Sequence, residues 1–541
     1  MKMRPNLRWT VFLDLVKLFP SSIMKTSNRI PFLLFGLACL QMTLFGQETK
    51  DPLIYKKQGE IMMVVDCDSA VSGKVVIPRM YQGRRVIGIG KSAFSRCRNL
   101  TEVVIPEGVT YIGSSAFYDC RSLKSLVVPN TVTTIANSAF RRCRGLQSVT
   151  IGKGVTFMGS SIFDGCSNLK SVVLPDGITE IGERFFNGCN ALKSVKIPDR
   201  VTSIGAKAFA YCSSLTEVKL PEGVTSIGES AFEACVMLLK VNIPEKVTTI
   251  EPSVFYRCER LENIRIPDGV TSIGERAFSS CTNLTSVVIP DRVTEVGKGA
   301  FLGCVGLKNV TIGKQVATMG NSVFSRCSSL SLVTIPDTVT AIGDYFFSNC
   351  VSLEKIILGE GLTVIPRSAF SVCSNLKEVV LGSKISRIED NAFVYCTGLE
   401  ELTLPLGIIT LGEGVFASCK SLKSIVLPDS VTTLGDRVFT SCSALESVAI
   451  PDSVTAIGKA PFWGCGNMKS VLVGEGNPVY FSSGGALFDT GENKLIYVPA
   501  STSGHYTIPD GVIAIAESAF SECSKLTSVT IPDGVTEIPR N

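Results

Sequence analysis

Histidine is almost absent from this chain, because His505 is the only one among 541 residues. Most hydrolases and zinc sites use imidazole as a base or a ligand, or else they use clustered thiolates. The chain also has no C-x-x-C pair, no G-x-x-x-x-G-K-[ST] phosphate loop and no G-x-S-x-G elbow. The sequence therefore predicts a protein that is not an enzyme, with no catalytic residue, no cofactor and no metal site.

Long apolar runs are missing beyond residue 46, where no stretch of 18 apolar residues occurs. Met24–Gly46 carries two basic residues ahead of an apolar segment, and it resembles a secretory signal peptide. A membrane anchor is the alternative, although the apolar run is shorter than the ~20 residues that a span needs. We predict a signal peptide over residues 1–46, with Met24 as an alternative initiator. The protein is then secreted or on the cell surface, with no membrane span after the signal segment.

A strong excess of one charge sign is missing as well. The 53 basic and 48 acidic residues leave a net charge of +5, which we take to be spread over the length of the chain. Nucleic-acid-binding domains instead concentrate Lys and Arg on one face. The composition therefore predicts no nucleic-acid partner.

Cysteine, by contrast, is abundant and regularly spaced. Seventeen cysteines recur every 23 residues from Cys97 to Cys465. A fixed period of about 20–29 residues is typical of a solenoid, in which each repeat makes one coil. A solenoid offers long surfaces and no central cleft, so the expected work of this protein is binding.

Residues 215–237 show what one coil contains. Apolar residues alternate over 215–220, which predicts a short strand, and Pro221 with the turn residues after it ends that strand. Val224–Ile227 predicts a second short strand. Ser230–Cys235 fits one helical turn that places Phe232 and Cys235 on the same side. Stacked coils would give parallel strands about 4.8 Å apart.

Each coil also contributes one phenylalanine, from Phe94 to Phe462. We expect these rings to be buried, because their pattern is too uniform for a ligand-stacking stripe. The cysteines are interpreted as buried free thiols. Disulfides between neighbouring coils are the alternative, but parallel Cβ atoms about 4.8 Å apart exceed the ~3.5–4.5 Å that a disulfide prefers.

The unit L-x-x-V-x-I-P-x-x-V-T-x-I-G-x-x-A-F-x-x-C resembles the BspA-type leucine-rich repeats of bacteria, also found in treponemal and trichomonad surface proteins. The resemblance extends over about residues 55–541. It implies a leucine-rich-repeat solenoid, a β-rich right-handed superhelix with parallel short strands and one helical turn per 23-residue coil. It also implies adhesion to host or extracellular-matrix proteins, or to other cells.

Two irregular stretches define the expected domains. Val75–Gly90 resembles the first repeat of the family, and Asn477–Pro509 resembles its longer β-rich repeat. We predict, after the signal peptide, an N-terminal capping segment at 47–78, regular repeats at 79–465, an irregular longer repeat at 466–510 and final repeats at 511–541. The last coil is incomplete, which predicts end-to-end self-association.

The outward strand positions of successive coils form a column that is mostly Val and Thr but basic and polar in its middle. The candidate ligand-binding residues are Lys196, Lys219, Asn242 and Arg265 in this column and Lys240 beside it. Complementary charge aids encounter and specificity, so this run fits a binding face. Ordinary solvated strand residues are the alternative.

These observations lead to one functional hypothesis and one alternative. The hypothesis is an exported, non-enzymatic leucine-rich-repeat protein that binds a protein or surface-glycan ligand, such as extracellular matrix, and mediates adhesion. The alternative is a scaffold or assembly protein of the cell envelope that has no host ligand.

Overall fold

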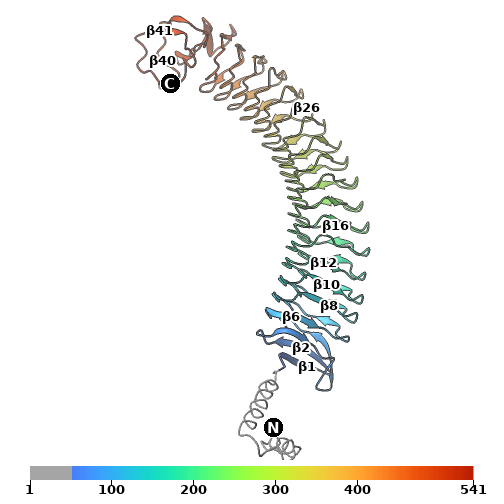
Figure 1. Ribbon diagram of the computed structural model, residues 1–541. Coiled ribbons are helices and arrows are strands. Elements are labelled where there is room, and N and C mark those ends of the chain that lie inside the picture. Colours follow the sequence, from blue (N-terminus) through green and yellow to red (C-terminus); the bar gives the residue numbers. More distant parts are fainter. Residues whose placement is uncertain (1–50, 540–541) are drawn as a thin grey trace, which may run out of the picture. The chain divides into compact units, whose positions relative to one another are not determined.

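The structure is a computed structural model that describes residues 51–539, so the predicted signal peptide and Met24 lie outside the described residues. From Ile54 onward the chain forms one compact unit of stacked coils (Figure 1). Equivalent residues of neighbouring coils pair in parallel 23 positions apart, as Ser125 does with Ser148. This confirms the solenoid.

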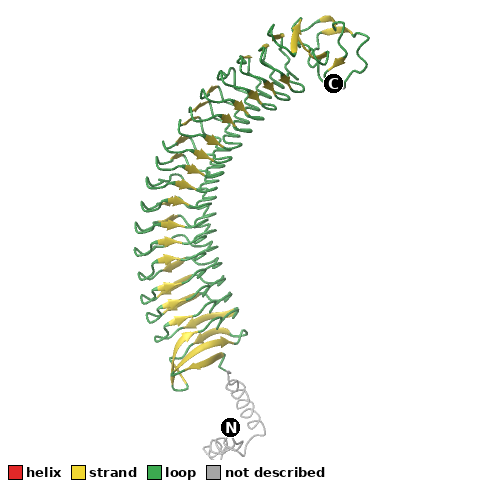
Figure 2. Cartoon of the chain, turned by 180° about the vertical axis from the view of Figure 1, so that it is seen from behind, coloured by secondary structure: helices red, strands yellow, loops and turns green. Residues whose placement is uncertain are grey.

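Most regular coils contribute to two ladders of parallel strands, and the strands alternate with loops along the row (Figure 2). The first ladder contains β3 (Ser72–Val76), β6 (Asn99–Val104), β8 (Ser125–Val128), β10 (Ser148–Ile151), β12 (Ser171–Val173), β15 (Glu217–Val218), β17 (Lys240–Val241), β20 (Ser286–Val288), β22 (Asn309–Thr311), β24 (Leu332–Ile335), β26 (Lys355–Leu358), β28 (Glu378–Val380), β31 (Ser424–Ile425), β33 (Ser447–Ile450), β35 (Ser470–Val473), β39 (Gly504–Thr507) and β41 (Leu526–Thr530).

The second ladder is made of shorter strands. It contains β5 (Arg84–Ile89), β7 (Tyr111–Ile112), β9 (Thr134–Ile135), β11 (Phe157–Met158), β13 (Glu180–Ile181), β14 (Ser203–Ile204), β16 (Ser226–Ile227), β18 (Thr249–Ile250), β19 (Ser272–Ile273), β21 (Glu295–Val296), β23 (Thr318–Met319), β25 (Ala341–Ile342), β27 (Val364–Ile365), β29 (Arg387–Ile388), β30 (Thr410–Leu411), β32 (Thr433–Leu434), β34 (Ala456–Ile457), β38 (Lys494–Tyr497) and β40 (Ala514–Ile515). Neither ladder is continuous, because each is divided into separate sheets.

The two ends of the row differ from the regular coils. Near the start, β1 (Leu53–Gln58) precedes β2 (Ile61–Cys67), which pairs in parallel with β5, and β4 (Met80–Tyr81) forms an antiparallel pair with β5. Near the other end, β36 (Tyr480–Ser483), β37 (Ala486–Asp489) and β38 pair antiparallel over a small core of their own. The last strand, β41, pairs with β39 and is largely exposed. The domain boundaries and the self-association stay predictions.

The helical turn expected at Ser230–Cys235 is not confirmed, and no helix occurs within residues 51–539. Ser230 and Ala234 have φ angles of 56°, in the left-handed region. As a result, the Ser230 and Phe232 N–H groups donate to the next coil, at 3.0 and 2.9 Å, while the Ala231 N–H donates within its own coil at 3.1 Å. An α-helix needs all its N–H groups along one axis. The segment is therefore a turn that forms a third hydrogen-bonded ladder between coils.

The phenylalanines and cysteines fill the centre of the coils, as predicted. The ring centroids of Phe232 lie 5.1 Å from Phe209 and 5.6 Å from Phe255, and all three side chains are fully buried. The cysteines from Cys97 to Cys465 are buried free thiols. In the middle coils each thiol donates to the phenylalanine carbonyl of the preceding coil, as Cys235 Sγ does to Phe209 O at 3.1 Å. Cysteine at this position therefore fills the core and also satisfies a buried carbonyl.

The glycine after the second strand lets the coils approach closely. A Cβ atom added at Gly228 would lie 2.6 Å from the backbone nitrogen of Ala206 in the preceding coil. Real side chains do not tolerate such a contact with backbone. In the coils that carry it, the glycine of the I-G pair permits this close approach, whereas Ala136, Glu251, Pro366 and Glu389 occupy the same position in other coils.

Candidate binding surface

The outward positions of the first strand ladder form an exposed column. The registers place Thr150 between Val127 and Val173, and Val288 beside Thr311. The exposed fractions of the three valines are 65%, 63% and 60%, whereas the residues on either side of each along the strand point into the core. Apolar side chains gathered on one exposed face are typical of an interaction surface.

Three of the predicted binding residues are lysines whose charge is not paired. Lys196, Lys219 and Lys240 are exposed, and none of them has an ion pair within residues 51–539. Lys196 and Lys219 line one shallow hollow on neighbouring coils. Lys240 pairs in register with Glu217 between β17 and β15. These three lysines present free charge on the same face of the solenoid.

Asn242 and Arg265 are already engaged. The Asn242 side-chain amide accepts a hydrogen bond from Leu220 N at 2.7 Å and donates one to Leu220 O at 2.9 Å. Its amide therefore bridges two coils, a role that its column position did not reveal. Arg265 forms ion pairs with Glu245 and, at 3.3 Å, with Asp268.

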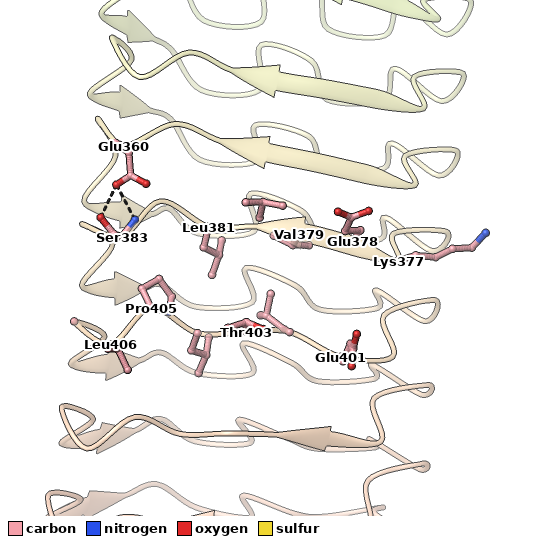
Figure 3. Close-up of a pocket in the computed structure, with 14 residues that line it drawn as sticks. Glu360, Lys377, Glu378, Val379, Leu381, Ser383, Glu401, Thr403, Pro405 and Leu406 are labelled. Carbon is pink, nitrogen blue, oxygen red and sulfur yellow. Dashed lines mark hydrogen bonds between the residues drawn. The ribbon is translucent and has the colours of Figure 1, made fainter.

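A hollow of about 580 Å³ opens farther along the same face, between β28 and the coil at 401–407 (Figure 3). The sheet ends at β28, because residues 401–404 form no strand. Glu378 and Glu401 lie at one end of the hollow, and Leu381 and Leu406 at the other (Figure 3). This arrangement offers carboxylates and apolar surface to one ligand.

One contact fixes the rim of this hollow at its apolar end. The Glu360 carboxylate accepts hydrogen bonds from Ser383 N at 2.9 Å and Ser383 Oγ at 2.6 Å, drawn as dashed lines in Figure 3. The hollow was not predicted from the sequence, although one residue of its lining departs from the repeat pattern. Leu406, which is 86% exposed, occupies the turn position that holds an aspartate, Asp429, in the following coil.

Residues 51–539 hold no group of three or more His, Cys, Asp or Glu side chains placed to bind a metal. Within the same range no helix could span a membrane. His505 lies on β39, with Nδ1 2.7 Å from Ser528 Oγ and Nε2 3.1 Å from Thr530 Oγ1.

Comparison with known proteins decides the family. The family model for the BspA type leucine rich repeat region matches overlapping segments of this sequence, which together span residues 87–482 and 500–541. This chain belongs to the BspA-type leucine-rich repeat family. No match was found among the curated proteins.

Among solved structures, a leucine-rich repeat protein from Bacteroides ovatus ATCC 8483 is 28% identical, covers 76% of this chain and 99% of its own, and has a TM-score of 0.57. A leucine rich cell surface protein from Faecalibacterium prausnitzii A2-165 is 23% identical, with coverage of 79% and 94% and a TM-score of 0.33. The pneumococcal vaccine antigen PcpA is 16% identical, with coverage of 90% and 98% and a TM-score of 0.30. BspA-type solenoids of this kind are typically non-enzymatic binding scaffolds.

Proposed function

We propose that this BspA-type protein is exported, is not an enzyme, and binds protein or surface-glycan ligands in the service of adhesion. The observation that carries the proposal is the exposed column of the first strand ladder. Val127, Val173 and Val288 are each at least 60% exposed there, although such side chains are more stable when buried. A partner that covers them would remove this apolar surface from water.

The three free lysines would add attraction over a longer range. Lys196 and Lys219 lie in the middle of the column and Lys240 lies beside it, and none of the three is neutralised by an ion pair with a residue that the structure describes. Exposed charge of one sign mainly raises the association rate and sets the partner's preferred sign. The ligand expected at this point is therefore acidic where it meets these coils.

Reversing the three lysines tests this part of the proposal. Lys196→Glu, Lys219→Glu and Lys240→Glu together should slow association with a ligand isolated from matrix or cell-surface material roughly tenfold or more at low salt. The dissociation rate should change little. Surface plasmon resonance over a range of salt concentrations measures both rates.

The matched control reverses Lys308, Lys314 and Lys384, which are exposed and give the same change in net charge. Equal slowing in both variants would assign the effect to net charge and would remove the lysine patch from the proposal. Arg265→Glu alone should have a smaller effect than the reversal of any of the three lysines, because Arg265 is already neutralised.

An envelope scaffold without a host ligand is the competing function. Protease treatment of intact cells separates the two, because a surface adhesin should be removed and a scaffold inside the envelope should be spared. Sparing of the chain would contradict the adhesion proposal.

A further inference from the structure

The net charge of +5 is not spread evenly over the chain, contrary to the expectation from composition. Residues 91–98, 114–121 and 137–144 are the same turn in three successive coils, and they hold seven basic residues and one acidic residue. Their net charge of +6 exceeds that of the whole chain. The equivalent turns of the next three coils, 160–167, 183–190 and 206–213, sum to zero.

Backbone hydrogen bonds hold these three turns side by side. Arg96 N donates to Tyr118 O at 2.6 Å, and Asp119 N donates to Arg141 O at 2.9 Å. The exposed arginines therefore line up across neighbouring coils. We call this set the arginine ladder; it consists of Arg96, Arg98, Arg121, Arg142 and Arg144.

A buried carboxylate orients two members of the ladder. The Asp119 side chain is only 4% exposed, and it accepts from Arg98 Nη2 at 2.9 Å and from Arg121 Nε at 2.8 Å. Burial acts to raise the pKa of Asp119, but the hydrogen bonds from Arg121 and Arg98 outweigh it and lower the pKa. Asp119 also accepts from Arg98 Nε at 3.0 Å and from Arg121 Nη2 at 3.3 Å, so it stays charged and holds each guanidinium plane by two N–H groups.

The other three arginines keep most of their donors for a partner. Arg142 Nη1 donates to Tyr118 Oη at 3.0 Å, and its guanidinium lies 5.9 Å from the centroid of that ring. Arg96 and Arg144 are exposed and form no ion pair with any residue in the range 51–539. Guanidinium groups bind sulfate and carboxylate in a bidentate way, and a fixed row of them suits a ligand whose anionic groups repeat.

We propose that the arginine ladder binds a linear sulfated polysaccharide. A single-stranded nucleic acid fits less well, because such ligands stack on exposed aromatic rings and the one aromatic side chain outside the core in these turns, Tyr118, is engaged by Arg142. A protein partner also fits less well, since protein interfaces have an apolar centre and these three turns expose no large apolar side chain. This site is separate from the strand column and does not depend on the function proposed for it.

Heparin is the probe that tests the ladder, with the full chain as the reference. Arg96→Gln, Arg142→Gln and Arg144→Gln together should weaken heparin binding ~10-fold at physiological salt, since each exposed charge contact contributes a modest share of the affinity. The dependence of affinity on salt should also become shallower, because fewer ions are released. Arg98 and Arg121 are left in place, because they neutralise Asp119.

The matched control is Arg257→Gln, Arg276→Gln and Arg326→Gln, which removes the same charge from the equivalent turns 252–259, 275–282 and 321–328 of later coils and should leave heparin binding unchanged. Equal weakening by the control would overturn the proposal, as would equal binding of heparin and its desulfated form. Single-stranded DNA that competes as well as heparin would overturn the assignment to a polysaccharide. Ligand capture by the strand column should persist in the ladder variant, so the two sites can fail independently.

Discussion

The repeats should lose stability steeply when the pH rises from about 9 to about 12. Burial raises the pKa of Cys212, Cys304 and Cys373 from 9.0 to about 12, in spite of a hydrogen bond that acts in the other direction. The unfolded thiols lose their protons near pH 9, whereas the folded thiols keep them. Their contribution to stability is thus fully present below pH 9 and is lost as the pH rises toward 12. The free energy of unfolding should fall by about 1.4 kcal/mol per pH unit for each buried thiol that unfolds.

Urea denaturation followed by circular dichroism at several pH values measures this slope. The variant with Cys212→Ala, Cys304→Ala and Cys373→Ala should be less stable at pH 7 because of the lost packing. Between pH 9 and 12 its free energy of unfolding should fall less steeply than that of the native chain, by about 1.4 kcal/mol per pH unit for each of the three thiols removed. An identical slope in the two proteins would show that other groups, such as lysine or tyrosine, cause the alkaline unfolding.

Removal of one ring from the phenylalanine ladder should cost about 3–5 kcal/mol of local stability. Phe232 is fully buried between two rings that lie nearly parallel to its own, at interplanar angles of 3° and 8°. The neighbouring coils cannot close the void left by Phe232→Ala, because their backbones are already hydrogen-bonded to one another. Hydrogen exchange should therefore rise in the adjacent coils and change little toward the ends of the row.

Phe157→Ala is the control for this substitution, because Phe157 is 49% exposed on the second strand ladder. It should cost much less stability and leave exchange in the core coils unchanged. Uniform loosening of the whole chain by Phe232→Ala would contradict the view that each coil depends mainly on its neighbours.

The ladders of the fold could be predicted because each coil repeats the same environment. Cys235 and Phe232 meet their equivalents 23 residues away, so a pattern visible in the sequence becomes a column in space. The turn around Ser230 could not be predicted in the same way. Its spacing fits a helix as well as it fits alternating left-handed residues, and only the hydrogen bonds to the next coil distinguish the two.

The candidate site was predicted less completely than the fold. The column position predicted that Lys196 and Lys219 are exposed, but it could not show that the Asn242 amide is used by Leu220. It also could not show where the strand ladder opens, as it does beside Leu406. The arginine ladder escaped notice because charge was averaged over the chain, whereas Arg98, Arg121 and Arg144 become neighbours only after the coils stack.

The central claim is that the exposed strand column is the ligand-binding face, and capture of matrix and cell-surface proteins tests it most directly. The comparison is between the native chain, a variant with Val127→Lys, Val173→Lys and Val288→Lys, and a control with Tyr111→Lys, Phe157→Lys and Ile409→Lys at exposed apolar positions in or beside the second ladder. The column tolerates lysine, since Lys196 and Lys219 already stand in it, so the fold should persist. The account predicts that the native chain and the control capture the same partners and that the valine variant loses them. Equal capture by all three proteins would contradict it.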